Sequence, residues 1–399
     1  MTDQAQAEDQ HTPGQAAARV GELARGLDFA LCGIAPARAS AYAEHFRQWL
    51  AAGKHGEMGY LADHASIRVD PRKLVEGARS VIVVADAYPV NEMGHEHEPP
   101  DAQAAQGRGR IAKYAWGDDY HKTIKKRLHQ LADALAGEFP GQVYRSTVDT
   151  APIFEREWAT LAGLGWTGKH TLMIHPRHGS YFLLGTIVTT LDLQTSEQAG
   201  YRAELSPPTD HCGSCTRCID ACPTEAISPE GYSVDGTRCI SYLTLEHRSA
   251  IDPARFAAMG DWIAGCDVCQ DVCPHNHRRL TTKKTTDTIA PPDTNRPPDT
   301  IAPLPIHPRY TPRPPAPGLD LLEVLGWTED DRRAVLQGSA IKRIKLDMMI
   351  RNALIVAGNR LKQDDNPALR KRIEAIANDA AAPEMVQATA REVLARLGI

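Results

Sequence analysis

The spacing of apolar residues over the first half of the chain predicts alternating helices and strands. Between residues 14 and 27, apolar side chains recur every three or four positions, as they do on one face of a helix. A short apolar strand is expected at residues 29–35. Residues 40–62 carry further helical periodicity, interrupted by Gly53-Lys54-His55-Gly56. The β-branched run at 80–85 is continuous, which is typical of a strand buried on both faces.

The alternation continues to about residue 200. Residues 118–137 predict one long amphipathic helix, and two further strands are expected at 171–176 and 181–192. We therefore expect a mixed α/β domain over residues 15–204, preceded by a disordered, polar N-terminus at 1–14.

Two segments lack the periodicity of a helix or a strand. Residues 90–107 are rich in Pro, Gly, His, Glu and Gln, and we expect a loop or a disordered excursion there. Residues 281–318 form a proline-rich insertion with a short repeat, Asp-Thr-Ile-Ala-Pro at 287–291 and again at 299–303. Because proline cannot continue a helix, this insertion is expected to be solvated and polyproline-like. After it, residues 319–399 predict paired short helices of an all-α, HEAT-like domain.

The cysteines carry the clearest chemical signal in the chain. Eight of the nine cysteines follow the pattern of a two-cluster bacterial ferredoxin, in the order Cys212, Cys215, Cys218, Cys222, Cys239, Cys266, Cys269 and Cys273, with proline after Cys222 and after Cys273. The fourth cysteine of such a run binds the other cluster. One [4Fe–4S] cluster is therefore expected on a first set of thiolates: Cys212, Cys215, Cys218 and Cys273. Ile263 stands where a full second run would begin, so the second set is Cys222, Cys239, Cys266 and Cys269. We expect a ferredoxin-like domain at 205–280.

Other roles for these cysteines fit less well. Structural zinc uses C-x2-C pairs separated by a longer spacer, and this spacing differs from that pattern. The N-terminus is polar and acidic, without the basic and apolar regions of an export signal, so we expect a cytoplasmic protein with reduced thiols. No apolar stretch approaches the length of a membrane span, and no membrane association is expected. Cys32 lies in an apolar run and is most simply a buried core residue.

Net charge gives no signal for a nucleic-acid partner, because the formal charge is −5 and the pI is about 6.3. Two local clusters are basic. One is Lys122, Lys125, Lys126 and Arg127. The other consists of Lys342, Arg343, Lys345, Arg351, Arg360, Lys362, Arg370, Lys371 and Arg372. Taken alone, each is more simply a solvated helix face.

Two further motifs are open to more than one interpretation. The run from Gly163 to His170 resembles a P-loop, but His170 replaces the hydroxyl residue and a helix is predicted at 152–163 where the preceding strand should be. Such a turn could still hold another phosphate, carboxamide or sugar. Asp149 opens a predicted helix, so it is either an N-cap or a proton donor for reductive chemistry.

These motifs occur together in one order. They are Tyr114-Ala115-Trp116-Gly117-Asp118-Asp119-Tyr120-His121, Asp149-Thr150-Ala151-Pro152, Ala162-Gly163-Leu164-Gly165-Trp166-Thr167-Gly168-Lys169, the eight cysteines, and Arg351-Asn352-Ala353-Leu354-Ile355-Val356-Ala357-Gly358-Asn359. The combination closely resembles the epoxyqueuosine reductase family from about residue 15 to the C-terminus. Ala151 departs from the glycine usual there, and the insertion at 281–318 is a second departure.

The resemblance implies a cofactor and a reaction. Members of the family bind cobalamin in the α/β domain beside one cluster and reduce an epoxide to an alkene. By similarity, Asp149 is the proton donor, and Arg156 lies two helical turns further on. Arg72, His121 and Lys169 are the other candidates for the cobalamin and substrate pocket.

The resemblance also implies partners. The substrate is epoxyqueuosine at the wobble position of tRNAs for Tyr, His, Asn and Asp, and the basic C-terminal helices are then expected to contact its phosphates. A low-potential donor of the flavodoxin or ferredoxin type and a monomeric state are expected. Two alternatives stay open: a corrinoid enzyme related to reductive dehalogenases, and a two-cluster electron carrier. The first usually has an export signal, and the second has no use for an α/β domain of this size.

Overall fold

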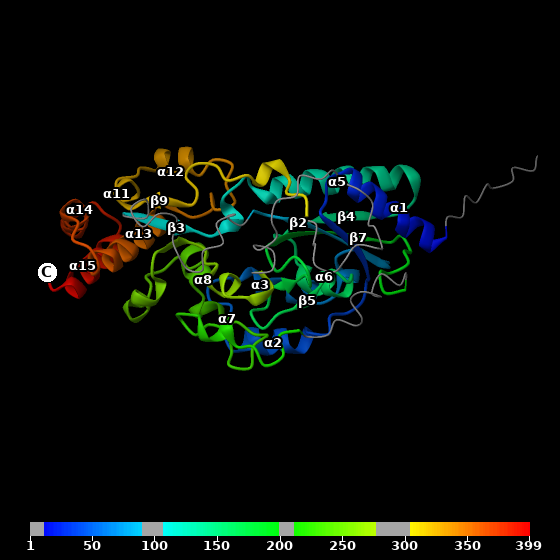
Figure 1. Cartoon of the computed structure of the whole chain (residues 1–399), viewed down its shortest axis with the longest axis horizontal. Coiled ribbons are helices and arrows are strands. Elements are labelled where there is room, and N and C mark those ends of the chain that lie inside the picture. Colours follow the sequence, from blue (N-terminus) through cyan, green and yellow to red (C-terminus); the bar gives the residue numbers. More distant parts are fainter. Residues whose placement is uncertain (1–11, 90–106, 199–210, 277–303) are drawn as a thin grey trace, which may run out of the picture.

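The computed structural model describes residues 12–89, 107–198, 211–276 and 304–399. The molecule is elongated, with an α/β sheet at one end and the C-terminal helices at the other (Figure 1). None of the helices within the described ranges combines the length and the apolar character that crossing a membrane requires. The predictions for 90–106 and for both copies of the proline-containing repeat lie outside the described residues.

The α/β part is built on a four-stranded antiparallel sheet in the order β1-β2-β7-β4. Its strands are β1 (Leu31–Pro36), β2 (Ser80–Ala87), β7 (Phe182–Thr189) and β4 (Tyr144–Thr147). Every residue of β2 is buried, which confirms the strand predicted from its continuous β-branched run. Successive side chains of a strand point to opposite faces, so the sheet has two apolar surfaces to cover.

Helices cover both faces of this sheet. On one face, α1 (Pro13–Gly26) and α5 (Tyr120–Glu138) pack against Ile82 and Val84. On the other face, α6 (Glu155–Leu161) packs against Val81 and Val83. Gly185 of β7 allows α5 to approach closely, because a Cβ atom there would lie 2.6 Å from Ile124. The two helices predicted from apolar periodicity at 14–27 and 118–137 are thereby confirmed as α1 and α5.

The remaining elements are short in the middle of the chain and longer at its C-terminus. The helices are α2 (Ala43–Ala51), α3 (Tyr60–Asp63), α4 (Ala65–Arg68), α7 (Arg217–Asp220), α8 (Ile240–Leu245), α9 (Val268–Asp271), α11 (Leu321–Val324), α12 (Glu329–Val335), α13 (Leu346–Leu361), α14 (Pro367–Asn378) and α15 (Glu384–Leu397). The strands are β3 (Arg108–Ile111), β5 (Trp166–Thr167), β6 (Met173–Ile174), β8 (Trp262–Ala264) and β9 (Gly318–Asp320). Short 3-10 turns lie at Pro71–Lys73, Lys113–Ala115, Gly236–Arg238, Pro253–Arg255, Ala257–Met259 and Pro308–Tyr310.

The break predicted inside residues 40–62 is present, since Gly53 and Gly56 adopt positive φ angles of 68° and 57° between α2 and α3. The strand expected at 171–176 is reduced to the two residues of β6, which pair with β5 in a small hairpin. Five strands, β3, β4, β5, β8 and β9, were not predicted. They contain two to four residues or alternate with arginine, so their apolar pattern is too short to detect.

A second sheet joins distant parts of the chain. β3 pairs in parallel with β8 from the cysteine region and antiparallel with β9 from the segment that precedes the C-terminal helices. One apolar core extends from Ile111 through Leu243 and Ile263 to Leu354. This core crosses the predicted boundary between the cysteine region and the helical region. The division into domains stays a prediction, because a shared core does not decide which segments fold alone.

Most of residues 304–318 are exposed or half-buried, as expected of a solvated segment, but Tyr310 is an exception. Tyr310 is only 2% exposed, and its hydroxyl donates to Asp86 Oδ2 at 2.6 Å. The guanidinium of Arg127 forms a buried ion pair with Asp86 and donates to the Tyr310 hydroxyl at 3.2 Å. Proline composition suggested solvation, but one aromatic side chain with a buried charged partner anchors this segment to the sheet.

The C-terminal region is helical, as predicted. α13 is apolar on most of its surface and packs against α15, α14 and β8. Whether these helices constitute HEAT-like repeats stays a prediction.

Candidate active site and cluster-binding cysteines

The first set of cysteines gathers at one place. Burial, and then the neighbouring thiols of Cys212 and Cys215, raise the pKa of Cys218 to about 11. Burial also raises the pKa of Cys273 to about 11, with Cys212 and Cys218 contributing. Although Cys273 is distant in sequence from the other three, the fold brings it to them, as the crossover rule requires.

The second set gathers beside the first. Cys239 interacts electrostatically with Cys222, while Cys266 interacts with Cys269 and Cys239. Cys239 is the N-cap residue of α8. Burial raises the pKa of its thiol, although the backbone N–H groups of Tyr242 and Ser241 act in the opposite direction. Cys269 also interacts with Cys218, so the two sets are neighbours. Cys239 therefore lies near the other three cysteines of the second set, and its role as a cluster ligand stays a prediction.

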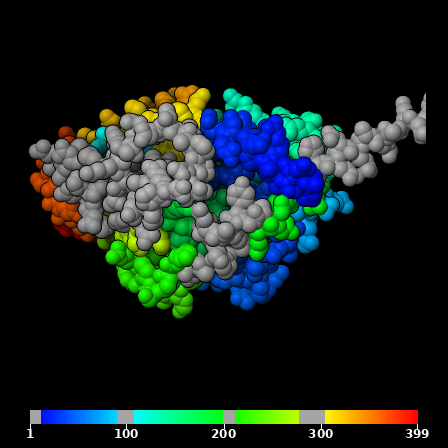
Figure 2. Space-filling model, turned by 45° about the vertical axis from the view of Figure 1, so that its right-hand side comes forward, coloured from blue at the N-terminus to red at the C-terminus, as the bar shows by residue number. Residues whose placement is uncertain are grey.

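Within the part of the chain that the structure describes, no three His, Cys, Asp or Glu side chains converge on the position of a single metal ion. This agrees with the arrangement of the thiols, because the cysteines of a four-iron cluster bind different irons and stand further apart than the ligands of one ion. The residues present fit two iron–sulfur clusters. In Figure 2 the segment from residue 211 onward, coloured bright green, forms a lobe at the lower left of the molecule.

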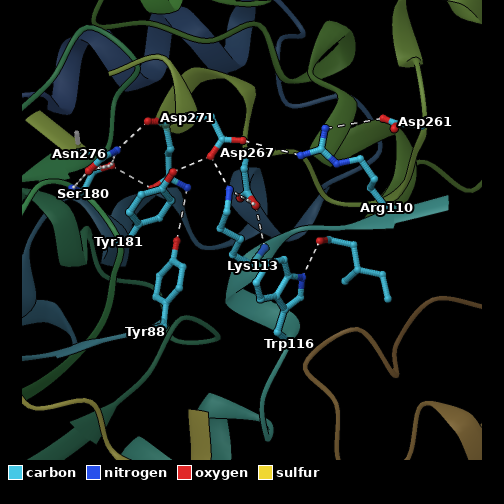
Figure 3. Close-up of polar contacts among 12 residues, drawn as sticks. Tyr88, Arg110, Lys113, Trp116, Ser180, Tyr181, Asp261, Asp267, Asp271 and Asn276 are labelled. Carbon is cyan, nitrogen blue, oxygen red and sulfur yellow. Dashed lines mark hydrogen bonds and ion pairs between the residues drawn. The ribbon is translucent and has the colours of Figure 1, made fainter. Parts of the chain in front are cut away.

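A charged network fixes the second set against the α/β part (Figure 3). The backbone N–H of Lys113 donates to Asp267 Oδ2 at 2.7 Å, and its ammonium group forms an ion pair with Asp271. Tyr181 donates its hydroxyl proton to Asp271 Oδ1 at 2.6 Å. Because Asp267 is 1% exposed, it needs this compensation. The network connects α9, which carries Cys269, to the start of β7.

The predicted proton donor belongs to a chain of four side chains from three separate segments. Asp149 follows β4 in a left-handed conformation with φ 51°, and its side chain is 47% exposed. His121 Nε2 lies 3.1 Å from Asp149 Oδ2, and His121 Nδ1 lies 2.8 Å from Asp119 Oδ1. Lys342 donates to the other oxygen of Asp119 at 2.9 Å. Asp119 also caps α5, which orients His121 in the first turn.

The charges along this chain alternate. Burial opposes the charge on His121, but its bonds to Asp119 and Asp149 dominate and raise its pKa to about 9. Burial would raise the pKa of Asp119, yet His121 and Lys342 hold it at about 2. The pKa of Asp149 is also lowered, because the hydrogen bond from His121 and the charges of Arg343 and Arg156 outweigh desolvation. At neutral pH the proton therefore resides on His121, between two carboxylates.

The four residues predicted to line the pocket make different contacts in the structure. His121 contacts Asp149 directly. The guanidinium of Arg156 donates to the carbonyl oxygen of Thr171 at 3.3 Å, and its charge acts on Asp149 and on Cys239. Arg72 forms a two-point ion pair with Asp70, and its side chain is 51% exposed.

Lys169 has a structural contact that the sequence did not indicate. Its ammonium group donates to the carbonyl oxygens of Gly213 at 2.6 Å and Cys215 at 3.0 Å. Within the glycine-rich run, β5 occupies the middle, and Gly165 packs against the backbone of Ile174. Lys169 thus holds the loop that carries the first set of cysteines.

Several residues near Asp149 had no recognisable sequence signal. Arg68 of α4 is 8% exposed, and its Nε atom has no hydrogen-bond partner within the described residues. Tyr60 is 47% exposed and interacts electrostatically with Arg68, Asp149 and Arg343. Glu155, the first residue of α6, accepts a hydrogen bond from the Asp149 backbone N–H at 2.8 Å. These side chains are recognised as neighbours of Asp149 only through contacts between separate segments, because no local sequence motif contains them.

The basic C-terminal residues serve different purposes. Arg351 is completely buried and donates to the carbonyl oxygens of Leu243, His247 and Ser249. The expectation that it contacts tRNA phosphates is therefore wrong. Arg343 lies near Asp149 and pairs with Glu246 at 2.7 Å.

Comparisons with known proteins identify the family. Residues 68–150 match the family described as "Epoxyqueuosine reductase QueG, DUF1730", and residues 211–276 match the 4Fe-4S double cluster binding domain. An epoxyqueuosine reductase of Synechococcus sp. (strain CC9605) is 38% identical over 308 residues, covering 77% of this chain and 82% of that protein. The chain belongs to the epoxyqueuosine reductase family. The corresponding protein of Alicycliphilus denitrificans is 35% identical over 377 residues, covering 91% of this chain and 94% of that protein.

Solved structures of epoxyqueuosine reductases have the same fold. One, in complex with an epoxyqueuosine-modified tRNA-Tyr stem loop, has a TM-score of 0.75 at 23% identity and covers 96% of this chain and 91% of that chain. The structure from Streptococcus thermophilus has a TM-score of 0.70 and covers 96% of this chain and 99% of that chain. Family membership identifies an oxidoreductase and replaces both alternatives, the dehalogenase relative and the electron carrier.

Proposed function

We propose that this chain reduces epoxyqueuosine to queuosine in tRNA, with Asp149 and His121 delivering a proton beside two iron–sulfur clusters. The proposal rests on family membership and on one observation above all. A cationic His121 is hydrogen-bonded to a solvent-accessible Asp149, and Arg156 lies near both Asp149 and a cluster cysteine. Reduction of an epoxide needs electrons and protons at the same place, and this arrangement supports the proposal that Asp149 and the clusters supply them.

The two sets of thiols are proposed to bind one [4Fe–4S] cluster each, with ligands divided as the sequence predicted. Such clusters transfer single electrons at low potential. We expect the electrons to come from a low-potential protein of the flavodoxin or ferredoxin type, and the chain to act as a monomer.

Cobalamin is proposed as the group between the clusters and the substrate. The fit rests on buried polar atoms next to the site that lack protein partners in the described residues, Arg68 Nε and His170 Nε2. Arg68 and Arg156 would hold it, and His121 would border it, whereas Arg72 and Lys169 are bound to other groups. When bound, reduced cobalt supplies a strong reductant or nucleophile that no side chain provides.

Side chains of the protein are proposed to protonate the epoxide oxygen. An epoxide becomes an alkene when both of its C–O bonds break, and the oxygen leaves as water after taking up two electrons and two protons. Asp149 is proposed to pass the proton of His121 Nε2 to this oxygen, because alkoxide is a poor leaving group unless protonated. Asp119 keeps His121 oriented, and Lys342 neutralises Asp119.

The tRNA is proposed to approach across the surface that carries Asp149. The exposed lysines of α5, Lys122, Lys125 and Lys126, follow His121 in the same helix. Lys342 and Arg343 reach the site from the C-terminal region. Cations on two sides of the site suit an anionic RNA whose wobble base must enter a pocket.

The test is anaerobic reconstitution followed by turnover of epoxyqueuosine-tRNA with a low-potential reductant, with nucleosides identified by mass spectrometry. We expect cobalamin to bind and queuosine to form. Asp149→Asn should keep both cofactor spectra and lose about 100-fold or more in rate, the usual scale for a lost general acid.

Asp133→Asn is the matched control. Asp133 is exposed on α5, and its substitution removes the same charge as Asp149→Asn. Failure of the unsubstituted protein to bind cobalamin would contradict the proposed cofactor. Full activity of Asp149→Asn would show that the aspartate is only a structural residue.

A further inference from the structure

Lys169 is held in a socket that two segments of the cysteine region form. Its ammonium group donates to the carbonyl oxygens of Gly213 at 2.6 Å and Cys215 at 3.0 Å, and its own carbonyl oxygen accepts the backbone N–H of Tyr232 at 2.8 Å. Its aliphatic stem lies against Gly231, where an added Cβ atom would stand 2.5 Å from Lys169 Cγ. Gly231 also has a φ angle of 81°, so the position requires glycine for two reasons. The ammonium group is therefore fixed beside the loop at 212–215.

Trp166, three residues before Lys169, borders the same set of cysteines. Its side chain is 3% exposed and packs with Ile174 and Cys273 in a small apolar cluster, against which Cys212 also packs. Within the described residues, the indole N–H of Trp166 has no hydrogen-bond partner. Buried N–H groups are normally paired, and the sulfur atoms of a cluster on Cys212 and Cys273 would be acceptors in these surroundings. The run from Trp166 to Lys169 thus contacts the first set of cysteines at two separate points.

A fixed cation at this place has an electrostatic consequence. A four-iron cluster with its four thiolates is already anionic, and reduction adds one more negative charge. Lys169 is half-buried, and a cation in such a position stabilises added negative charge more than it would in bulk water. The reduction potentials of iron–sulfur clusters depend on net charge and on the hydrogen bonds around the sulfurs. A lysine bound to the loop of two ligands is therefore placed to change the potential of their cluster.

We propose that Lys169 raises the reduction potential of the first cluster, by fixing the loop at 212–215 and by placing its positive charge beside the reduced form. The single electron comes from the low-potential donor of the proposed function. The inference rests on the proposed binding of a [4Fe–4S] cluster by the first set of cysteines. Lys169 acts through the loop that carries Cys215 and through its charge, so it is a positioning residue.

The test is a redox titration of the anaerobically reconstituted protein, followed by electron paramagnetic resonance, with iron and sulfide content measured in parallel. Lys169→Gln keeps a neutral N–H donor for the carbonyl oxygens and removes the charge. We expect both clusters to be retained and one midpoint potential to fall, so that the ratio of reduced to oxidised cluster at a fixed potential decreases about tenfold. This change corresponds to about 59 mV for a one-electron couple. Lys169→Met, which also removes the hydrogen bonds, should lower the potential at least as much.

Three further variants make the result specific. Lys169→Arg keeps the charge and should leave both midpoint potentials close to those of the unsubstituted protein. Lys371→Met removes the charge of an exposed lysine on α14 and should change neither potential. The effect of Lys169→Gln should persist in a Cys239→Ala background, which is expected to keep only the first cluster, and this assigns the change to that cluster.

Unchanged midpoint potentials in a Lys169→Gln variant that holds about eight irons per chain would overturn the inference and leave the proposed function intact. The inference also fails if the change disappears in the Cys239→Ala background. Loss of the first cluster from both Lys169→Gln and Lys169→Met would likewise overturn it, since Lys169 would then only anchor the loop. Absence of iron–sulfur signals from the unsubstituted protein would overturn the proposed clusters themselves.

Discussion

Asp149 and three titratable side chains near it differ in their pKa shifts, although three of the four groups are carboxylic acids. Asp119 and Asp149 each have a bond to His121, so both are ionised. Burial, and then the negative charge of Asp149, raise the pKa of Glu155 to about 8, although the Asp149 N–H acts in the opposite direction. Chemical identity alone does not distinguish these groups. Their neighbours do.

The raised pKa of His121 makes a prediction about stability. A group whose pKa rises on folding, here from 6.5 to about 9, stabilises the folded state fully below pH 6.5 and loses this effect as pH rises through 9. Thermal unfolding of the anaerobic protein should therefore show a larger difference between wild type and His121→Asn at pH 6 than at pH 9.5. An equal difference at both values would mean that the two aspartates do not hold the imidazolium.

At the scale of elements, single polar side chains connect helices that apolar packing alone would leave loosely oriented. Arg351 on α13 reaches the carbonyl oxygens around the end of α8, and Asn352 donates to the carbonyl oxygens of Thr244 and Ile263. The same segment is recognisable in sequence as a family motif. Its basic residue had suggested RNA contact, whereas the tertiary structure gives it a buried structural role.

Replacing this arginine should destabilise the fold. Arg351→Met keeps much of the volume but leaves three carbonyl oxygens without their donor, which should cost roughly 3 kcal/mol or more in the free energy of unfolding. Lys371→Met, the same change at an exposed position of α14, should stay within about 0.5 kcal/mol. Chemical denaturation measures both. A stable Arg351→Met variant with weakened tRNA binding would restore the phosphate-contact interpretation.

Cys239 allows a test of the cluster assignment, because it caps α8 away from the compact cysteine runs. Cys239→Ala should lower iron from about eight to about four per chain and remove one cluster signal. Cys32→Ala is the control, since Cys32 lies in β1, outside both thiol sets. Iron near eight in Cys239→Ala would refute the assignment.

At the scale of the whole molecule, the cysteine region and the C-terminal helices share one core. β3, β8 and β9 join three distant segments in one sheet, and apolar residues from all three pack together. The hydrogen-bonded row of side chains that begins at Asp149 likewise ends on Lys342, which follows the cysteine region in the sequence. The cysteine region and the C-terminal helices are thus held in a fixed relation by a core that no single segment supplies.

A truncated chain tests this dependence. Removing residues 318–399 deletes β9 and the helices that cover β8 and α8. We expect the truncated chain to aggregate or to lose the second cluster, because large apolar surfaces become exposed. Iron content and solubility are measured beside the full chain. A soluble truncated protein with about eight irons would show that the ferredoxin-like region folds alone.

The sequence by itself determined the features that depend on local spacing. The cysteine run, the long helices α1 and α5, and the central strand β2 could be predicted, because ligand spacing and apolar periodicity are properties of adjacent residues. Asp149 and His121 were identified through motifs that resemble a family. Their hydrogen bond was not predictable.

Only the tertiary structure decided which side chains meet. Glu155 and Arg68 are ordinary residues in sequence, and they matter because separate elements bring them to Asp149. Lys169 and Arg351 appeared available for ligands, yet folding directs their charges to backbone carbonyl oxygens. A sequence pattern indicates which chemistry a side chain is capable of. Long-range packing determines its partners, and these partners determine its charge and its role.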